Sequence, residues 1–203
     1  MLENYFVTAI GTDSGKTVVS AIIAEMLGGD YWKPIQAGYP RDTETVRELV
    51  SNTESKFHPE AYLLNTPASP HASARIDGVN IDIESIKLPQ TENSLVIEGA
   101  GGCLVPLNDQ EVVADLIPQF RSRVVLVSNL YLGSINHTLL TAEYLHNKGY
   151  SVKGIIFNGE ENEESQRIIL KKTQLRYLLH VKKEQSINRE MISKYAELLS
   201  NNW

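Results

Sequence analysis

The sequence predicts a three-layer α/β fold in which helices flank a mostly parallel central sheet. Short apolar, β-branched runs recur at 5–8, 31–33, 94–97, 124–128 and 152–157, as expected of parallel strands that are buried on both faces. Helical patterns fill the intervals at 17–27, 43–50, 112–120 and 135–147. No linker or internal repeat divides the sequence, so we expect residues 1–203 to form a single domain.

The segments outside this alternation differ from one another in composition. Residues 66–71 contain two prolines, which is typical of a loop near a site. Residues 160–164 are acidic and poor in apolar side chains, which predicts an exposed loop or the frayed start of a helix. Apolar residues recur at helical spacing over 187–199, so we expect a C-terminal helix that docks on the sheet.

Composition and charge argue against several classes of protein. The formal net charge is −6, whereas nucleic-acid binding draws on clustered Lys and Arg. The pairs Lys171-Lys172 and Lys182-Lys183 are expected on solvated surface. No segment holds the roughly 18 uninterrupted apolar residues of a membrane-spanning helix. The N-terminus lacks the features of an export signal, and Cys103 has no second cysteine to pair with, so we expect a cytoplasmic location.

A phosphate-binding loop follows the first predicted strand. Residues 9–17 read Ala-Ile-Gly-Thr-Asp-Ser-Gly-Lys-Thr and precede a helical segment. Backbone N–H groups at a helix N-terminus hold phosphate oxygens. Gly15 permits close approach, Lys16 would reach the β and γ phosphates, and the Thr17 hydroxyl would bind Mg²⁺. The chain is therefore expected to be a magnesium-dependent nucleotide-binding enzyme of the P-loop class.

The spacing within this loop is unusual. The common P-loop pattern has glycine at the position of Ile10, whereas here Gly11 stands one place later. We therefore expect the loop to follow a different path from the common one.

Charged residues at the ends of two further predicted strands are candidates for binding a metal ion or an anionic ligand. Glu98 ends an apolar run and precedes a Gly-rich loop, which suits a metal ligand; the alternative is a carboxylate that faces solvent. Lys33 ends the second strand, where a lysine is costly unless it meets an anion; the alternative is a structural lysine with its head in water. Asp42 is equally well interpreted as the N-cap of the helix at 43–50 and as a metal ligand.

Covalent catalysis and zinc binding are not expected. Cys103 stands beside two glycines with no positioned base evident, so we interpret it as a packing residue. The His and Cys residues lack zinc-ligand spacing. Mg²⁺ is the expected metal.

Taken together, these motifs resemble the dethiobiotin synthetase family. From Tyr5 to Thr17 the chain aligns without gaps with the family's Tyr-Phe-Val-Thr-Gly-Thr-Asp-Thr-x-Val-Gly-Lys-Thr. The further matches, in the correct order, are Lys33-Pro34, Asp42, Ser69-Pro70-His71, Glu98-Gly99-Ala100-Gly101-Gly102 and Gly133-Ser134-Ile135-Asn136-His137. The resemblance extends from Tyr5 to about Asn158.

The resemblance implies a reaction of biotin biosynthesis, catalysed by a C–N bond-forming ligase. 7,8-Diaminopelargonic acid, CO₂ (or bicarbonate) and a nucleoside triphosphate, with ATP as the default, give dethiobiotin, the diphosphate and phosphate. An amine becomes a carbamate, the carbamate takes the γ-phosphoryl group, and the second amine closes the ring. Lys16 and Lys33 are the implied catalytic residues, while Thr17, Asp42 and Glu98 gather Mg²⁺.

The resemblance also implies which residues touch the ligands. The nucleotide and its metal are assigned to Asp13, Ser14, Gly15, Lys16, Thr17, Val18, Asp42, Glu98, Gly99, Ala100, Gly101 and Asn158. The substrate is assigned to Thr12, Ala37, Gly133 and Asn136. Family members are homodimers in which the loop matching residues 132–136 binds the distant carboxylate of the substrate across the interface. Gly133 and Asn136 would then serve the active site of the partner.

The chain departs from the family pattern in three places. Ala37 stands where Ser or Thr is common, which removes a hydroxyl contact. The leading glycine of the loop is Ala9, and Asp13 represents the acidic loop residue. The Leu-Gly-x-Ile-Pro turn that binds the base is replaced by Leu179-His180-Val181-Lys182-Lys183, so the base preference stays open.

Other functions on this kind of scaffold are less consistent with the sequence. Partitioning-type ATPase switches, which dimerise on DNA or membrane, have a signature lysine where this chain has Gly11. Another carboxylate- or amide-activating ligase would bring an added glutaminase domain, for which 203 residues leave no room. A noncatalytic nucleotide-binding module would leave Lys33, Asp42 and Glu98 without a purpose.

Overall fold

A seven-stranded sheet forms the centre of residues 2–203, the part of the chain that this computed structural model describes. Its strand order is β4-β2-β6-β1-β7-β8-β9, and all neighbouring strands run parallel. β3 and β5 form a small second parallel sheet. The strands are β1 (Asn4–Ala9), β2 (Asp30–Trp32), β3 (Ile35–Ala37), β4 (Phe57–His58), β5 (Tyr62–Leu64), β6 (Leu95–Gly102), β7 (Arg123–Asn129), β8 (Val152–Asn158) and β9 (Tyr177–Val181).

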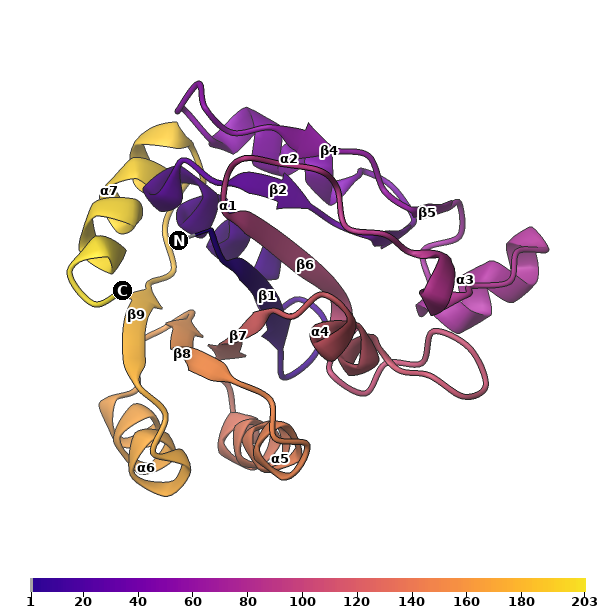
Figure 1. The fold of residues 1–203 in the computed structure, drawn as a ribbon. Coiled ribbons are helices and arrows are strands. Elements are labelled where there is room, and N and C mark those ends of the chain that lie inside the picture. The colour runs from indigo at the N-terminus through magenta and orange to yellow at the C-terminus, as the bar shows by residue number, and fades with distance from the viewer. Residues whose placement is uncertain (1) are drawn as a thin grey trace.

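Helices cover both faces of the large sheet, which confirms the predicted three-layer α/β fold (Figure 1). α1, α2 and α7 pack on one face, and α4, α5 and α6 pack on the other. The helices are α1 (Lys16–Leu27), α2 (Asp42–Leu49), α3 (Pro70–Asp77), α4 (Leu116–Gln119), α5 (Ser134–Asn147), α6 (Glu163–Thr173) and α7 (Arg189–Ser200), with 3₁₀ turns at Ile83–Ser85 and Val113–Asp115. Among residues 2–203, none of these helices combines the length and the apolarity needed to cross a bilayer.

The apolar side chains of each strand divide between the two layers. In β1, Val7 packs with Ile22 of α1, whereas its neighbour Phe6 packs with Trp32 and Phe120 on the opposite face. Burial of each such side chain stabilises the fold by roughly 1.5–3 kcal/mol. Both faces of the strands are therefore apolar, which explains the nearly continuous apolar runs in the sequence.

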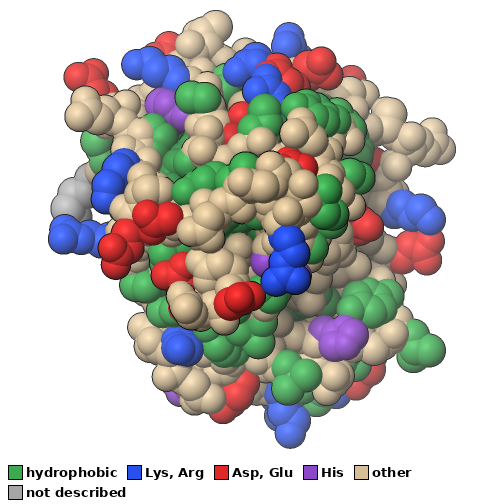
Figure 2. All heavy atoms as spheres, turned by 90° about the vertical axis from the view of Figure 1, so that its right-hand side faces the viewer, with side chains coloured by type: hydrophobic (Ala, Val, Ile, Leu, Met, Phe, Trp, Pro, Cys, Tyr) green, Lys and Arg blue, Asp and Glu red, His purple; other side chains and the backbone are tan. Residues whose placement is uncertain are grey.

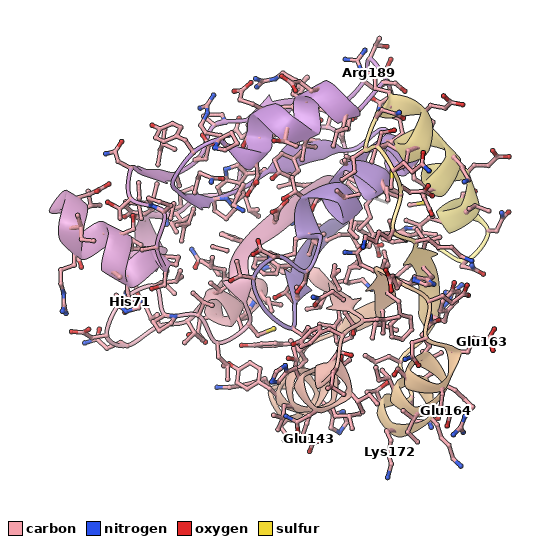
Figure 3. The ribbon with its side chains drawn as sticks, turned by 180° about the vertical axis from the view of Figure 1, so that it is seen from behind. His71, Glu143, Glu163, Glu164, Lys172 and Arg189 are labelled. Carbon is pink, nitrogen blue, oxygen red and sulfur yellow. The ribbon has the colours of Figure 1, made fainter. Side chains whose placement is uncertain are left out.

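The two ends of the described chain meet beside β1. Figure 1 shows them near each other, and the ring of Trp203 lies 4.8 Å from that of Tyr5. The outer surfaces of the helices are polar: Figure 3 shows Glu143 on α5 and Glu164 and Lys172 on α6 pointing away from the sheet. The predicted docking of the C-terminal helix is confirmed by α7, which packs against α1.

Three expectations about secondary structure are wrong. The helical pattern at 112–120 is a 3₁₀ turn followed by the short α4, because Pro118 cannot continue a regular hydrogen-bonding pattern and the Asp115 carboxylate accepts the Val112 N–H. The Gly-rich segment after Ile97 continues β6 as far as Gly102, which pairs with Ala9. The loop at 66–71 ends at Pro70, where α3 begins. The strand β9 was not predicted.

A buried carboxylate fixes the start of β2. Asp30 is fully buried, and its oxygens accept hydrogen bonds from the Lys56 N–H at 2.9 Å and from Asn93 Nδ2 at 2.9 Å, while His58 Nε2 lies 2.7 Å away. Burial acts to raise the pKa of Asp30, but these hydrogen bonds outweigh burial and lower it. Asp30 therefore stabilises the folded state in its charged form.

We expect this carboxylate to make the stability of the protein depend on acid pH. Because the folded pKa is depressed, the contribution is present above the unfolded pKa of about 3.9 and is lost as pH falls through the folded value. The free energy of unfolding of wild type should exceed that of Asp30→Asn at pH 7, and the difference should shrink below about pH 4. Urea unfolding followed by circular dichroism measures this. A difference that does not change with pH would contradict the assignment.

Candidate functional site

The predicted residues converge at the carboxyl ends of β1, β2 and β6. A cleft of about 730 Å³ opens there, and its lining includes Thr12, Asp13, Gly15, Lys16, Thr17, Lys33, Ala37, Asp42, Glu98, Ala100 and Gly101. Residues 67–70 of the Pro-rich loop, Gln36 and Val105 also line the cleft, so that loop borders the candidate site. Figure 2 shows the molecule from the right-hand side of Figure 1, and acidic and basic side chains are interspersed on that face.

The phosphate loop ends in a glycine that no larger residue can replace without strain. Gly15 is the N-cap of α1, with φ at +89°. A β-carbon at this position would lie 2.4 Å from Nδ2 of Asn158, whose Nδ2 donates a hydrogen bond to the Ser14 carbonyl at 3.0 Å. The first N–H groups of a helix have no partner within the helix. The start of α1 therefore presents backbone donors to an anion at the cleft.

Side chains of the loop tie it to neighbouring strands. The Ser14 hydroxyl lies within hydrogen-bond distance of the Gly11 carbonyl, at 3.0 Å, and of Asn129 Oδ1, at 2.8 Å. Lys16 is buried, and its Nζ donates to the Gly11 carbonyl at 3.4 Å. Burial lowers the pKa of Lys16, although the charge of Glu98 acts to raise it. These hydrogen bonds fix the conformation of the loop, and the Lys16 ammonium beside it is largely shielded from water.

Glu98 lies at the centre of a buried ionic cluster. It is 1% exposed. Its Oε1 accepts hydrogen bonds from the Thr17 hydroxyl at 3.0 Å and from Lys33 Nζ at 3.1 Å, and its Oε2 accepts one from the Tyr31 hydroxyl at 3.0 Å. Lys33 also pairs with Asp42. The solvent-facing alternative for Glu98 and the water-facing alternative for Lys33 are therefore both wrong, because each charge meets a buried partner.

The cluster fixes the protonation of its members. Burial acts to lower the pKa of Lys33, but the charges of Glu98 and Asp42 outweigh burial and raise it. Burial, and after it the charge of Glu98, raises the pKa of Tyr31 well above its usual value. Lys33 is therefore a cation, and Tyr31 a hydrogen-bond donor, at neutral pH.

The structure excludes one of the two interpretations of Asp42. The N-cap of α2 is Arg41, and Asp42 is the first helical residue. Its carboxylate pairs with Lys33, while its N–H donates to Gln36 Oε1 at 3.2 Å. Gln36 in turn donates to the Gly38 carbonyl at 3.1 Å. The N-cap interpretation is wrong, and Asp42 faces the cleft.

The oxygen donors at this cleft suit Mg²⁺. The Thr17 hydroxyl and the carboxylates of Glu98 and Asp42 are hard ligands of the kind that Mg²⁺ prefers. Across residues 2–203, His, Cys, Asp and Glu side chains do not gather in groups of three or more that could hold a metal ion. Mg²⁺ is commonly bound through one or two carboxylates together with phosphates and water.

Six predicted residues lie outside the lining of this cleft. Ser14 and Asn158 support the loop as described above. Val18 packs against the core on the α1 face. A β-carbon on Gly99 would lie 3.0 Å from the Phe6 ring, so this glycine permits close packing behind the site. Gly133 caps α5 with φ at +105°, and Asn136 follows in the first turn. Both residues come more than 30 positions after the end of β6. Neither of them lines the cleft.

An apolar patch lies next to the start of α5. We define the α5 patch as Leu104, Tyr131, Leu132 and Leu140, all of which are largely exposed. Leu104 and Leu140 line a hollow of about 410 Å³ together with His137, and the Tyr131 hydroxyl hydrogen-bonds to His137 Nδ1.

Sequence reasoning missed two residues of the site. Tyr31 and Gln36 both contact its charged members, yet each is an ordinary residue in or beside an apolar strand. A signal did exist for Tyr31, because residues two apart on a strand share a face, and Tyr31 is two residues before Lys33.

Comparison with known proteins finds a matching family and similar proteins. Residues 3–191 match the family described as AAA domain. The chain is 58% identical to the ATP-dependent dethiobiotin synthetase BioD of Cytophaga hutchinsonii, over 100% of this chain and 99% of that protein. It is 51% identical to the protein of the same name from Christiangramia forsetii, with coverage of 97% and 96%. Both likenesses extend over nearly the whole length of this chain.

Solved structures with the same fold are more distant in sequence. The septum site-determining protein MinD of Pyrococcus horikoshii, complexed with Mg-ADP, gives a TM-score of 0.59 at 14% identity and covers 97% of this chain and 95% of its own. A ParA family ATPase from Chlorobium tepidum gives 0.58 at 10% identity, with coverage of 97% and 98%. At these identities the likeness shows the fold alone.

The geometry of Gly15 generates a prediction about nucleotide binding. Gly15→Ala introduces strain at positive φ, of roughly 1–3 kcal/mol, and also a clash with Asn158. We expect the affinity for ADP, measured by calorimetry, to fall by roughly tenfold or more. The matched control is Gly78→Ala, since Gly78 has φ at +68° and open space around its α-carbon. Wild-type ADP affinity in Gly15→Ala would contradict the assigned phosphate site.

Proposed function

This chain belongs to the ATP-dependent dethiobiotin synthetase family, and on that premise we propose that it closes the cyclic urea of dethiobiotin. The substrates are 7,8-diaminopelargonic acid, carbon dioxide and a nucleoside triphosphate, with ATP as the default. The observation that carries the proposal is the Lys33–Glu98 pair, 3.1 Å apart and buried beside the phosphate loop. A nucleotide site alone needs no second buried lysine there.

The proposed chemistry has three steps. The nitrogen of one amine attacks carbon dioxide and loses a proton, giving a carbamate. A carbamate oxygen then attacks the γ-phosphorus, and the diphosphate leaves. Finally the second amine attacks the carbamate carbon and loses a proton, phosphate leaves with that oxygen, and the ureido ring closes. Phosphorylation thus converts a poor leaving group into a good one.

The protein contributes positioning and charge to these steps. Lys16 and Lys33 line the same cleft and are both buried, so they neutralise the negative charge on the γ-phosphoryl group and the carbamate where water does not screen it. Thr12 and Ala37 border the space between these lysines and contact the diamine. Because Ala37 has no hydroxyl, it offers backbone groups alone to the substrate.

The nucleotide and Mg²⁺ occupy the other side of the cleft. The N–H groups that open α1 would bind the phosphates. Thr17, Glu98 and Asp42 would hold Mg²⁺, which would supply charge neutralisation for phosphoryl transfer. Asn158, which already contacts the loop backbone, lies on the side of the base.

The apolar α5 patch supports a homodimeric arrangement. Pairing of two copies through exposed Leu132 and Leu140 would cover this surface. It would place the start of α5, with Gly133 and Asn136, at the cleft of the partner. A helix N-terminus suits the distant carboxylate of the substrate, which the residues of the cleft itself leave without a dedicated cation.

A direct assay tests the proposed function. The protein is mixed with Mg²⁺, bicarbonate, diaminopelargonate and each nucleoside triphosphate in turn, and the diphosphate and the ureido product are measured. We expect equal amounts of both with at least one nucleotide. The proposal fails if diphosphate release is the same without the diamine, or if no cyclic urea forms.

Replacement of the second lysine should stop the chemistry without unfolding the protein. Lys33→Met removes a cation that faces the reacting groups, so we expect turnover to fall by roughly 10²–10³-fold, the scale of losing one preorganised electrostatic contact. Thermal melting checks the fold. Lys172→Met, on the exposed side of α6, is the control and should keep wild-type turnover. A Lys33→Met enzyme with normal turnover would exclude this role.

A shared active site predicts complementation between two defective variants. Asn136→Asp adds a negative charge near the substrate carboxylate, so this variant and Lys33→Met should both be impaired. If each site takes Lys33 from one copy and Asn136 from the other, random mixing restores about a quarter of the sites, because half of the dimers are mixed and each mixed dimer has one intact site. Turnover of refolded mixtures measures this. Activity that equals the average of the two variants would contradict the shared site.

A further inference from the structure

Tyr31 and Glu98 are brought together by the register of two parallel strands. Tyr31 of β2 pairs with Val96 of β6, and Glu98 lies two residues further along β6. Side chains two apart on a strand share a face, so Tyr31, Val96 and Glu98 all face the α1 layer, where Tyr31 and Val96 belong to the same core cluster. The Tyr31 ring reaches along this layer towards the cleft, and its hydroxyl ends at the Glu98 carboxylate.

The two oxygens of Glu98 have different surroundings. Oε1 contacts Thr17 and Lys33, which both line the cleft. Oε2 contacts the Tyr31 hydroxyl, which is fully buried. The contacts of Oε1 come from groups that also face the ligands, whereas the contact of Oε2 comes from the core. Oε2 is therefore held by the core, and Oε1 is free to exchange its present hydrogen-bond partners for a ligand.

We propose that Tyr31 is a positioning residue for magnesium in the nucleotide complex. Its hydroxyl holds Oε2 so that Oε1 keeps its direction when Thr17 and Lys33 turn to the metal and the phosphates. Without that hydrogen bond, the Glu98 carboxylate can rotate towards Lys33 or the metal, and its orientation is no longer fixed. This inference uses the nucleotide-binding part of the proposed function, and it is independent of the diamine and of ring closure.

The chemistry of buried ligands supports this role. Groups that hydrogen-bond to a metal-ligating carboxylate orient it, and their loss typically costs 10–100-fold in metal affinity. A hydrogen bond to a charged acceptor is also stronger than one between neutral groups. The Tyr31 hydroxyl, as a neutral donor, stabilises Glu98 without neutralising it, so the carboxylate keeps its charge for the cation.

Calorimetric titration with ADP, with and without Mg²⁺, tests the inference without any turnover. The measured quantity is the gain, meaning the ratio of the ADP dissociation constant without Mg²⁺ to that with Mg²⁺. In Tyr31→Phe we expect this gain to fall by roughly tenfold relative to wild type, while the affinity for ADP without Mg²⁺ stays unchanged. An unchanged gain in Tyr31→Phe would overturn the proposal, and so would the absence of any gain in wild type.

Control variants separate positioning from a purely structural effect. Tyr5→Phe removes the partly buried hydroxyl of another tyrosine, which donates to the Glu3 carboxylate away from the cleft, and it should keep the wild-type gain. Tyr31→Met offers a second variant without the hydroxyl, should Tyr31→Phe melt too early to be titrated. In a Glu98→Gln background, Tyr31→Phe should change the gain no further; an additional tenfold loss there would show that Tyr31 acts elsewhere.

The outcome is distinguishable from failure of the proposed reaction. If ring closure is absent but the gain still depends on Tyr31, the synthetase proposal fails and the positioning role stands. If ring closure occurs and Tyr31→Phe keeps the full gain, the synthetase proposal stands and the positioning role of Tyr31 fails.

Discussion

The constraint on which the site depends is the burial of the Glu98 carboxylate at the end of β6. At 1% exposure, this charge is tolerated because donors from three other places surround it: Thr17 at the start of α1, Tyr31 within β2, and Lys33 just after β2. Parallel strands bring these positions to a common edge. Buried ionic pairs contribute little net stability, so stability alone does not account for this one, in agreement with the proposed role at the cleft.

The fold by itself does not determine that chemistry. ATPases that share it at 10–14% identity have the same layered arrangement, and function resides in the site built on it. In this chain the segment after β2 is part of that site, because Lys33 pairs with Asp42 and Gln36 accepts a hydrogen bond from the Asp42 N–H. Under the proposed function, the phosphate loop binds the nucleotide, Asp42 belongs to the magnesium side, and Lys33 faces the carbamate.

Much of this arrangement could be predicted from the sequence, for a physical reason. The loop up to Thr17, the carboxylate of Glu98 and the amine of Lys33 are polar groups placed at the ends of apolar runs, where few explanations other than a ligand exist. Tyr31 was missed although it is two residues before Lys33, because its ring is apolar and the partner of its hydroxyl, Glu98, lies on a neighbouring strand that is distant in sequence. The short α4 was misjudged because Pro118 and Asp115 override the apolar periodicity. β9 was missed because Tyr177–Val181 follows exposed segments without a turn signal.

Carbamate activation by the Lys33–Glu98 site is the central claim, and the fate of an oxygen atom tests it most directly. When carbon dioxide carrying ¹⁸O supplies the carboxyl group, one of its oxygens should leave with phosphate and the other should remain in the urea carbonyl. Mass spectrometry of the inorganic phosphate from single-turnover reactions, run with fresh labelled carbon dioxide, measures this. The account predicts one ¹⁸O atom per phosphate, in equal amount to the ureido product. Phosphate whose new oxygen comes from water would contradict it.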